Sequence, residues 1–99
     1  MNIFEITQPP TTTELTDVLV QNTVLRIERI VSTGQTSDWY DQEENEFVIL
    51  LSGAATIDFG NEQQNLVAGD YLVIPAHQRH RVSATSQEPA CVWLCVFYK

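Results

Sequence analysis

The two histidines of the chain, His77 and His80, follow a Gly-Asp turn, a four-residue strand-like run and Pro75. Imidazole is the side chain that most readily exchanges a proton near neutral pH, and it is also a common metal ligand. If the chain binds a metal or carries out acid–base chemistry, this turn is the first place to expect it. In a plain strand, positions 77 and 80 point to opposite faces, so both imidazoles can act together only if Pro75 begins a turn.

A second polar segment, residues 39–46, is the candidate for the rest of the site. It contains a tryptophan, a tyrosine, two amides and four carboxylates. Tyr40 and Gln42 share a face by the two-residue period of a strand, which suits either the wall of a pocket or a hydrogen-bonded core patch. Trp39 could stack on a ligand or cover the mouth of a barrel, and the sequence favours neither.

The spacing within these two segments resembles the two motifs of the cupin family. The first motif corresponds to Gly34, Tyr40, Gln42, Glu46 and Gly53, and the second to Gly69, Pro75 and His80. The resemblance covers residues 34–84 and implies a double-stranded β-helix, an antiparallel jelly-roll barrel with its pocket inside one end. In metal-binding cupins three histidines and a glutamate hold one divalent ion. The corresponding positions of this chain are Tyr40, Gln42, Glu46 and His80, and His77 stands where the motif usually has glycine.

The resemblance leaves two alternatives for the pocket. In the first, Glu46 and His80 bind one divalent ion of iron, manganese, nickel or zinc, together with one or two of Gln42, His77 and Tyr40. One carboxylate and one imidazole are few ligands for a transition metal, and a tyrosine would have to lose a proton of pKa about 10. In the second alternative, which is equally open, the pocket holds no metal.

Two functions follow from these alternatives. The chain is either a small-molecule enzyme with a weak metal site, or a metal-free module that binds or senses a sugar or a small carboxylic acid without turnover. In an enzyme without a metal, Glu46, His80 and Tyr40 would be the general acid and base. A structural or interaction role with a degenerate pocket is a third reading.

Arg29 is a further candidate for the pocket wall. In the strand-like run 24–31 it shares a face with Leu25, Ile27 and Val31, and this apolar face is expected to point inward. A buried arginine needs a carboxylate partner. We therefore predict that Arg29 binds either Glu46 or the carboxylate of a ligand.

The elements that must position these residues are short strands. Apolar and β-branched runs alternate with turn signals, and no window longer than ten residues has a clean helical period. The expected strands are residues 24–31, 46–51, 54–59, 64–67, 71–74, 79–84 and 91–98. This pattern predicts an all-β antiparallel barrel in one domain, residues 1–99. Residues 1–21, with Pro9-Pro10, are expected to form an arm that packs on the barrel or on a partner subunit.

The last expected strand is apolar on both faces. Cys91, Trp93, Cys95 and Phe97 share one face, and Val92, Leu94, Val96 and Tyr98 share the other. One face can fill the barrel, and the other predicts a contact with a second copy, so we expect a homodimer. Four residues of strand span about 13 Å, which is too far for a disulfide between Cys91 and Cys95.

The net charge of −8, from 13 acidic and 5 basic residues, disfavours some partners. Nucleic acid and anionic membrane surfaces would be repelled, so we expect neither as a partner and expect a small-molecule ligand instead. The first residues lack the pattern of a secretion signal, and no apolar run is long enough to span a bilayer. The expected location is the cytoplasm.

Overall fold

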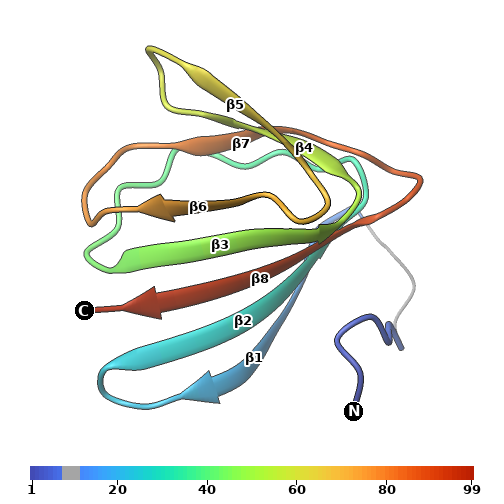
Figure 1. The fold of residues 1–99 in the computed structure, drawn as a ribbon, viewed down its shortest axis with the longest axis horizontal. Coiled ribbons are helices and arrows are strands. Elements are labelled where there is room, and N and C mark those ends of the chain that lie inside the picture. Colours follow the sequence, from blue (N-terminus) through green and yellow to red (C-terminus); the bar gives the residue numbers. More distant parts are fainter. Residues whose placement is uncertain (8–11) are drawn as a thin grey trace.

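Eight antiparallel strands form two sheets that face each other (Figure 1). The structure is a computed structural model, which describes residues 1–7 and 12–99. The strands are β1 (Leu15–Gln21), β2 (Leu25–Ser32), β3 (Asn45–Ser52), β4 (Ala54–Asp58), β5 (Gln63–Val67), β6 (Tyr71–Ile74), β7 (Arg81–Thr85) and β8 (Cys91–Tyr98). The described residues include no helix, and hence none that could cross a membrane. The predicted all-β, antiparallel fold is confirmed.

The larger sheet has the strand order β1-β2-β8-β3-β6, and the smaller sheet has the order β5-β4-β7. The terminal strand β8 lies in the middle of the larger sheet, between β2 and β3. One face of β8 packs in the core between the sheets, and its other face, with Leu94 and Val96, lies on the outside of the larger sheet. The chain passes from the larger to the smaller sheet at Gly53, where the sheets come together (Figure 1).

The core lies between the sheets at this closed end. Apolar side chains from the inner faces of both sheets are buried there, among them Val48, Leu50, Ala55, Ile57, Leu66, Ile74, Cys91 and Trp93. Cys91 and Cys95 are both free and buried, as predicted. The Trp93 indole N–H donates a hydrogen bond to Ser32 Oγ at 3.2 Å, which satisfies the one polar atom of that ring.

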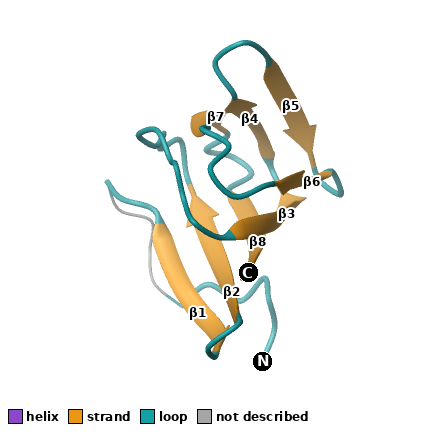
Figure 2. Ribbon diagram, turned by 90° about the vertical axis from the view of Figure 1, so that its left-hand side faces the viewer, coloured by secondary structure: helices purple, strands orange, loops and turns teal. Residues whose placement is uncertain are grey.

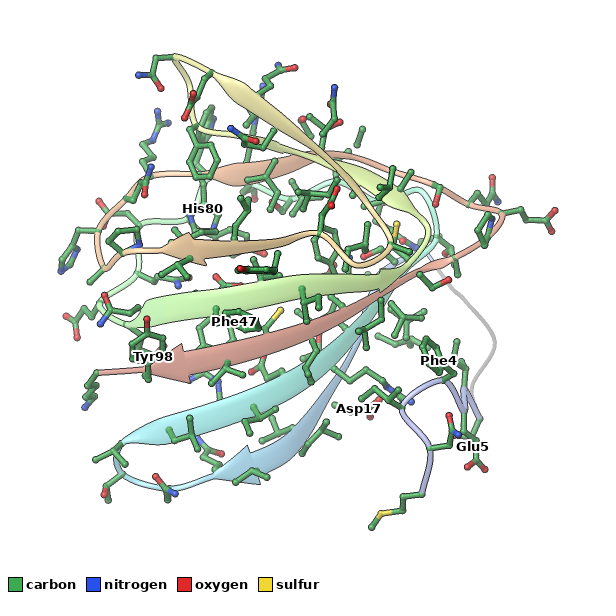
Figure 3. The ribbon with its side chains drawn as sticks, viewed as in Figure 1. Phe4, Glu5, Asp17, Phe47, His80 and Tyr98 are labelled. Atoms are coloured by element: carbon green, nitrogen blue, oxygen red, sulfur yellow. The ribbon has the colours of Figure 1, made fainter. Side chains whose placement is uncertain are left out.

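The expected arm 1–21 is resolved into two different parts. Its second half is β1, which pairs with β2 and forms one edge of the larger sheet (Figure 2). The described N-terminal residues lie beside this edge of the sheet, where Phe4 and Glu5 approach Asp17 (Figure 3). The Pro9-Pro10 pair, on which the expectation of an extended arm rested, lies outside the described residues.

The outer face of the larger sheet is apolar. One row that crosses four strands consists of Ile27, Val96, Phe47 and Val73, which are directly opposite one another in the strand register. In the next row, Ile49 lies between Leu94 and Tyr71. Tyr71 and Val73 on β6 are 62% and 57% exposed. We call this surface, made of the outward residues of β2, β8, β3 and β6, the outer face.

Candidate functional site

A cavity of about 350 Å³ opens between the two sheets, at the end away from Gly53. Its size is near the lower end of the range for small-molecule pockets. The cavity is lined by Glu14, Thr16, Arg26, Glu28, Ile30, Tyr40, Gln42, Glu44, Glu46, Val48, Ile57, Ile74, His80, Val82, Trp93, Cys95 and Phe97. The residues that line it come from both sheets and from the segment before β3, so the whole fold contributes to the site.

Register explains why the wall changes from polar to apolar. On the inner face of the larger sheet, Phe97 lies between Arg26 and Glu46, and in a deeper row Trp93 lies between Ile30 and Leu50. Directly opposite residues on one face are neighbours. The charged side chains therefore gather near the open end, and the apolar ones form the floor toward the core.

Glu46 and His80 meet in this cavity. Glu46 is at the start of β3 and His80 immediately precedes β7, so they come from different sheets. Their side chains are only 9% and 5% exposed, and Glu46 Oε1 lies 3.8 Å from His80 Nε2. That distance is too long for a hydrogen bond, but it permits both groups to contact one ligand atom. Figure 3 shows His80 in the space between the sheets.

His80 is held in one orientation by its neighbours. An isolated β-bridge joins Tyr40 and His80, with Tyr40 N–H donating to the His80 carbonyl and the reverse. The rings of Tyr40 and Phe59 lie 5.4 Å and 6.2 Å from the imidazole ring, centroid to centroid. Nδ1 lies 2.9 Å from the carbonyl oxygen of Gln78. Because a carbonyl can only accept, Nδ1 carries a proton, and Nε2 is left facing the cavity.

Burial changes the pKa of Glu46. Loss of solvent raises the pKa of its carboxyl above the ordinary 4.5, and a hydrogen bond from Gln42 Nε2 at 3.2 Å, the nearby His80 and a hydrogen bond with Cys95 act in the opposite direction. Burial, followed by the charge of Glu46, raises the pKa of the Cys95 thiol well above its usual range, so that thiol stays protonated. The net result is a carboxyl that exchanges protons closer to neutral pH than an exposed glutamate.

We expect the buried charge of Glu46 to make stability depend on pH. A carboxyl whose pKa is raised on folding stabilises the protein fully below pH 4.5, and this contribution is lost as pH rises through the folded-state pKa. The variant Glu46→Gln keeps the size and removes the titration. In urea unfolding, its free energy of unfolding relative to wild type should therefore increase as pH rises above 4.5.

The exposed Glu62, in the turn between β4 and β5, provides the control for this measurement. Glu62→Gln should leave the pH profile parallel to that of wild type. If the profile of Glu46→Gln were also parallel, Glu46 would not carry the buried charge that the structure indicates.

Three of the predicted pocket residues lie elsewhere. His77 is exposed, its Nδ1 is 2.8 Å from Asp41 Oδ1, and it does not line the cavity, so it cannot replace a missing ligand there. Its backbone has φ +64°, which explains why the motif usually has glycine at this position. Trp39 is likewise outside the cavity, where the guanidinium groups of Arg79 and Arg81 stack on its ring at 4.0 and 4.7 Å.

The prediction that Arg29 points into the barrel is wrong. The inner face of β2 is formed by Arg26, Glu28 and Ile30, and Arg29 points to the outer face. There it pairs with Asp17 and donates to the backbone carbonyls of Ile3 and Glu5. Arg29 therefore holds the N-terminal residues against the sheet and binds neither Glu46 nor a ligand in the cavity.

Four charged residues of the cavity were missed by sequence reasoning, namely Glu14, Arg26, Glu28 and Glu44. Arg26 donates from Nε to Glu28 and through both terminal nitrogens to Glu44, and it lies over the ring of Phe97 at 4.3 Å. The alternation of Arg26 and Glu28, which puts both on one face of β2, was the available signal. It would have identified them if a polar interior had been considered for this barrel.

Comparison with known proteins agrees with this architecture. The profile of the cupin domain family matches residues 28–97. The chain belongs to the cupin family. A solved structure from Ralstonia eutropha JMP134, provisionally described as a mannose-6-phosphate isomerase, superimposes on this cupin with a TM-score of 0.93 at 36% identity, covering 100% of this chain and 96% of that one.

Two more distant structures share the fold. A cupin superfamily protein from Desulfitobacterium hafniense DCB-2 has 22% identity and a TM-score of 0.81, covering 92% of this chain and 82% of that chain. The protein KdgF from Halomonas sp. has 17% identity and a TM-score of 0.78, covering 100% of this chain and 93% of that one. None of the curated proteins matches the sequence.

The donor set of this cupin does not fit the divalent ion that metal-binding cupins hold. Of the four positions that correspond to their ligands, Tyr40 and Gln42 bear a phenol and an amide, and the Gln42 amide already donates to Glu46. Partial burial, and then the charge of Glu14, raise the pKa of Tyr40, which disfavours the phenolate that a metal would need. Within the described residues, no three His, Cys, Asp or Glu side chains are grouped to hold an ion.

Proposed function

We propose that this cupin is a small-molecule isomerase that transfers protons with Glu46, His80 and Tyr40, without a metal. The observation that carries the proposal is the buried pair of Glu46 and His80, 3.8 Å apart at the wall of a cavity of about 350 Å³. A carboxyl with a raised pKa and an imidazole with a free Nε2 are the groups that general acid–base catalysis requires. The provisional description of the Ralstonia eutropha structure as a sugar isomerase supports the same reaction class.

The geometry suggests how an aldose and a ketose would interconvert. Glu46 takes the proton from the carbon next to the carbonyl and later returns it to the former carbonyl carbon. His80 Nε2 takes the proton of the neighbouring hydroxyl and delivers it to the former carbonyl oxygen. No proton is gained or lost overall. Tyr40 stays protonated because its pKa is raised, so its hydroxyl can donate a hydrogen bond to the oxygen on which negative charge develops.

Proton exchange with solvent tests this proposal without knowledge of the product. D-Mannose, D-fructose, D-mannosamine and D-mannose 6-phosphate are each incubated with the protein in D₂O containing EDTA, and the C–H signals next to the carbonyl are followed by proton NMR. We expect deuterium to enter at that carbon in at least one of these compounds. If one of these compounds binds but none exchanges deuterium, the protein is a binding module and the proposed enzyme function is wrong. Exchange that needs an added divalent ion would restore the metal-dependent reading.

We further propose that the outer face joins two copies of the chain in a homodimer. With a net charge of −8, two copies repel each other least where their surfaces are uncharged. The row of Ile27, Val96, Phe47 and Val73 is such a surface, and Arg29 beside it is neutralised by Asp17. Ile27, Phe47 and Val96 are partly buried and Val73 is exposed, and apolar patches left in contact with solvent are typical of subunit contacts.

Light scattering at micromolar concentration should give twice the mass of the chain. The variant Val73→Glu should give the mass of one chain, because it places a charge within the contact, on the edge strand β6. Val67, which is 60% exposed on the smaller sheet, is the matched control, and Val67→Glu should remain dimeric. A monomeric wild-type protein would contradict the proposal.

A further inference from the structure

We propose that the ligand of the cavity carries a positively charged amino group and no phosphate, an inference that rests on the proposed function for the location of the site. Among the described residues that line the cavity, four are glutamates and one is an arginine. The lining is therefore strongly negative, and it favours a cation over an anion.

The single arginine of the cavity is not free to bind an anion. Nε of Arg26 lies 2.8 Å from Glu28 Oε2, and its terminal nitrogens lie 3.0 and 3.2 Å from the two oxygens of Glu44. This bidentate pair with Glu44 uses the donors that would recognise a phosphate. A phosphate would have to displace one glutamate and approach the others, so the cavity disfavours it.

The carboxylates are arranged to receive an organic cation rather than a metal ion. They surround the cavity from different elements, with Glu14 at the exposed rim before β1, Glu28 on β2, and Glu46 on β3. The charge of Glu28 raises the pKa of both Glu14 and Glu46, as a minor cause beside burial, so the negative charges act on each other across the cavity. An ammonium group among them would relieve this repulsion.

The position of His80, beside Glu46, is a second observation that bears on the ligand. His80 is 4% exposed, and its Nε2 faces the cavity with no hydrogen bond from the described residues. Nε2 points into the open space of the cavity, where a hydroxyl of a bound ligand could form a hydrogen bond with it. A molecule with a hydroxyl near His80 and an ammonium near the glutamates matches both features, as an amino sugar does.

Three sugars that differ in one group test the inference. Isothermal titration calorimetry at pH 6.5 compares D-mannosamine, D-mannose and D-mannose 6-phosphate. We expect D-mannosamine to bind at least about tenfold more tightly than D-mannose, and D-mannose 6-phosphate to bind more weakly than D-mannose. Added salt should reduce the preference for D-mannosamine, because screening weakens charge–charge attraction.

The double variant Glu14→Gln/Glu28→Gln should reduce this preference at least threefold, whereas Glu62→Gln, outside the cavity, should preserve it. Equal binding of the three sugars, tighter binding of the phosphate, or binding of none of them would overturn the inference. The deuterium exchange experiment measures turnover, whereas the titration measures binding. Preferential binding of D-mannosamine without exchange would overturn the proposed function alone, and exchange with tight binding of the phosphate would overturn the inference alone.

Discussion

His80→Asn is expected to lower the rate of deuterium exchange by about 10²- to 10⁴-fold, the usual contribution of one general acid or base. His80 Nε2 lies at the cavity wall, 3.8 Å from Glu46, and no other imidazole lines the cavity among the described residues. Asparagine cannot relay the hydroxyl proton. The measurement is the initial rate of exchange in D₂O for whichever sugar the wild-type protein processes.

The second histidine of the chain provides a matched control. His77 is exposed, pairs with Asp41 and lies outside the cavity, and asparagine tolerates its positive φ. His77→Asn should therefore exchange deuterium at the wild-type rate. Equal losses in both variants, with both proteins folded by circular dichroism, would show that His80 has no special role.

Gly53→Ala should destabilise the fold by about 2–5 kcal/mol. Gly53 has φ +88°, and an added Cβ would lie 2.8 Å from Ser86 Oγ and 2.9 Å from both the Ala90 carbonyl oxygen and Cys91 Cα. The backbone conformation alone costs about 1–2 kcal/mol with a side chain, and forcing atoms into a packed site adds about 1–3 kcal/mol. At about 4–8 °C per kcal/mol for a domain of this size, the melting temperature should fall by about 10 °C or more.

Gly34 separates the two causes of this loss. It has φ +98°, but no atom lies within 4 Å of the position that a Cβ would occupy. Gly34→Ala should therefore lose only the backbone contribution of about 1–2 kcal/mol. Equal melting temperatures for the two variants would mean that the turn at Gly53 relaxes, and that the junction between the sheets is less tightly packed than the structure indicates.

The strand pattern and the central pair of the site could be predicted from the sequence. Seven strand ranges were expected, and each matches an observed strand to within two residues at both ends; β1 lies within residues 1–21, for which an arm was expected instead. Of the two apolar faces of β8, the one with Cys91, Trp93, Cys95 and Phe97 fills the barrel as predicted, and the contact of the other face with a second copy stays a prediction. Glu46 and His80 were paired through the spacing of the two motifs, and the structure brings them together.

The prediction failed for β2 because it assumed that apolar residues point inward. In this barrel the interior near the open end is a polar cavity, so Arg26 and Glu28 point inward. Leu25, Ile27 and Val31 of the same strand lie on the outer face, whereas Ile30 lines the cavity. The prediction took the odd-numbered residues of the strand as inward, whereas the even-numbered ones point inward. Such an error moves every side chain to the opposite face, and Arg29 was therefore placed on the wrong face.

The positions of Trp39 and His77 depend on loops, which have no period from which a direction can be inferred. Trp39 is held by stacking with Arg79 and Arg81, two residues from another part of the chain. His77 is directed outward by a positive φ and by its contact with Asp41. These tertiary contacts, rather than local sequence, decide where both side chains point.

The two tryptophans give the protein an internal optical reporter. Trp93 forms part of the cavity wall, whereas Trp39 lies outside the cavity between two arginines. In a Trp39→Phe protein, the remaining indole emission would come from the cavity wall alone. A ligand that enters would change the polarity around that indole and shift its emission, so that occupancy could be read by fluorescence before any product is known.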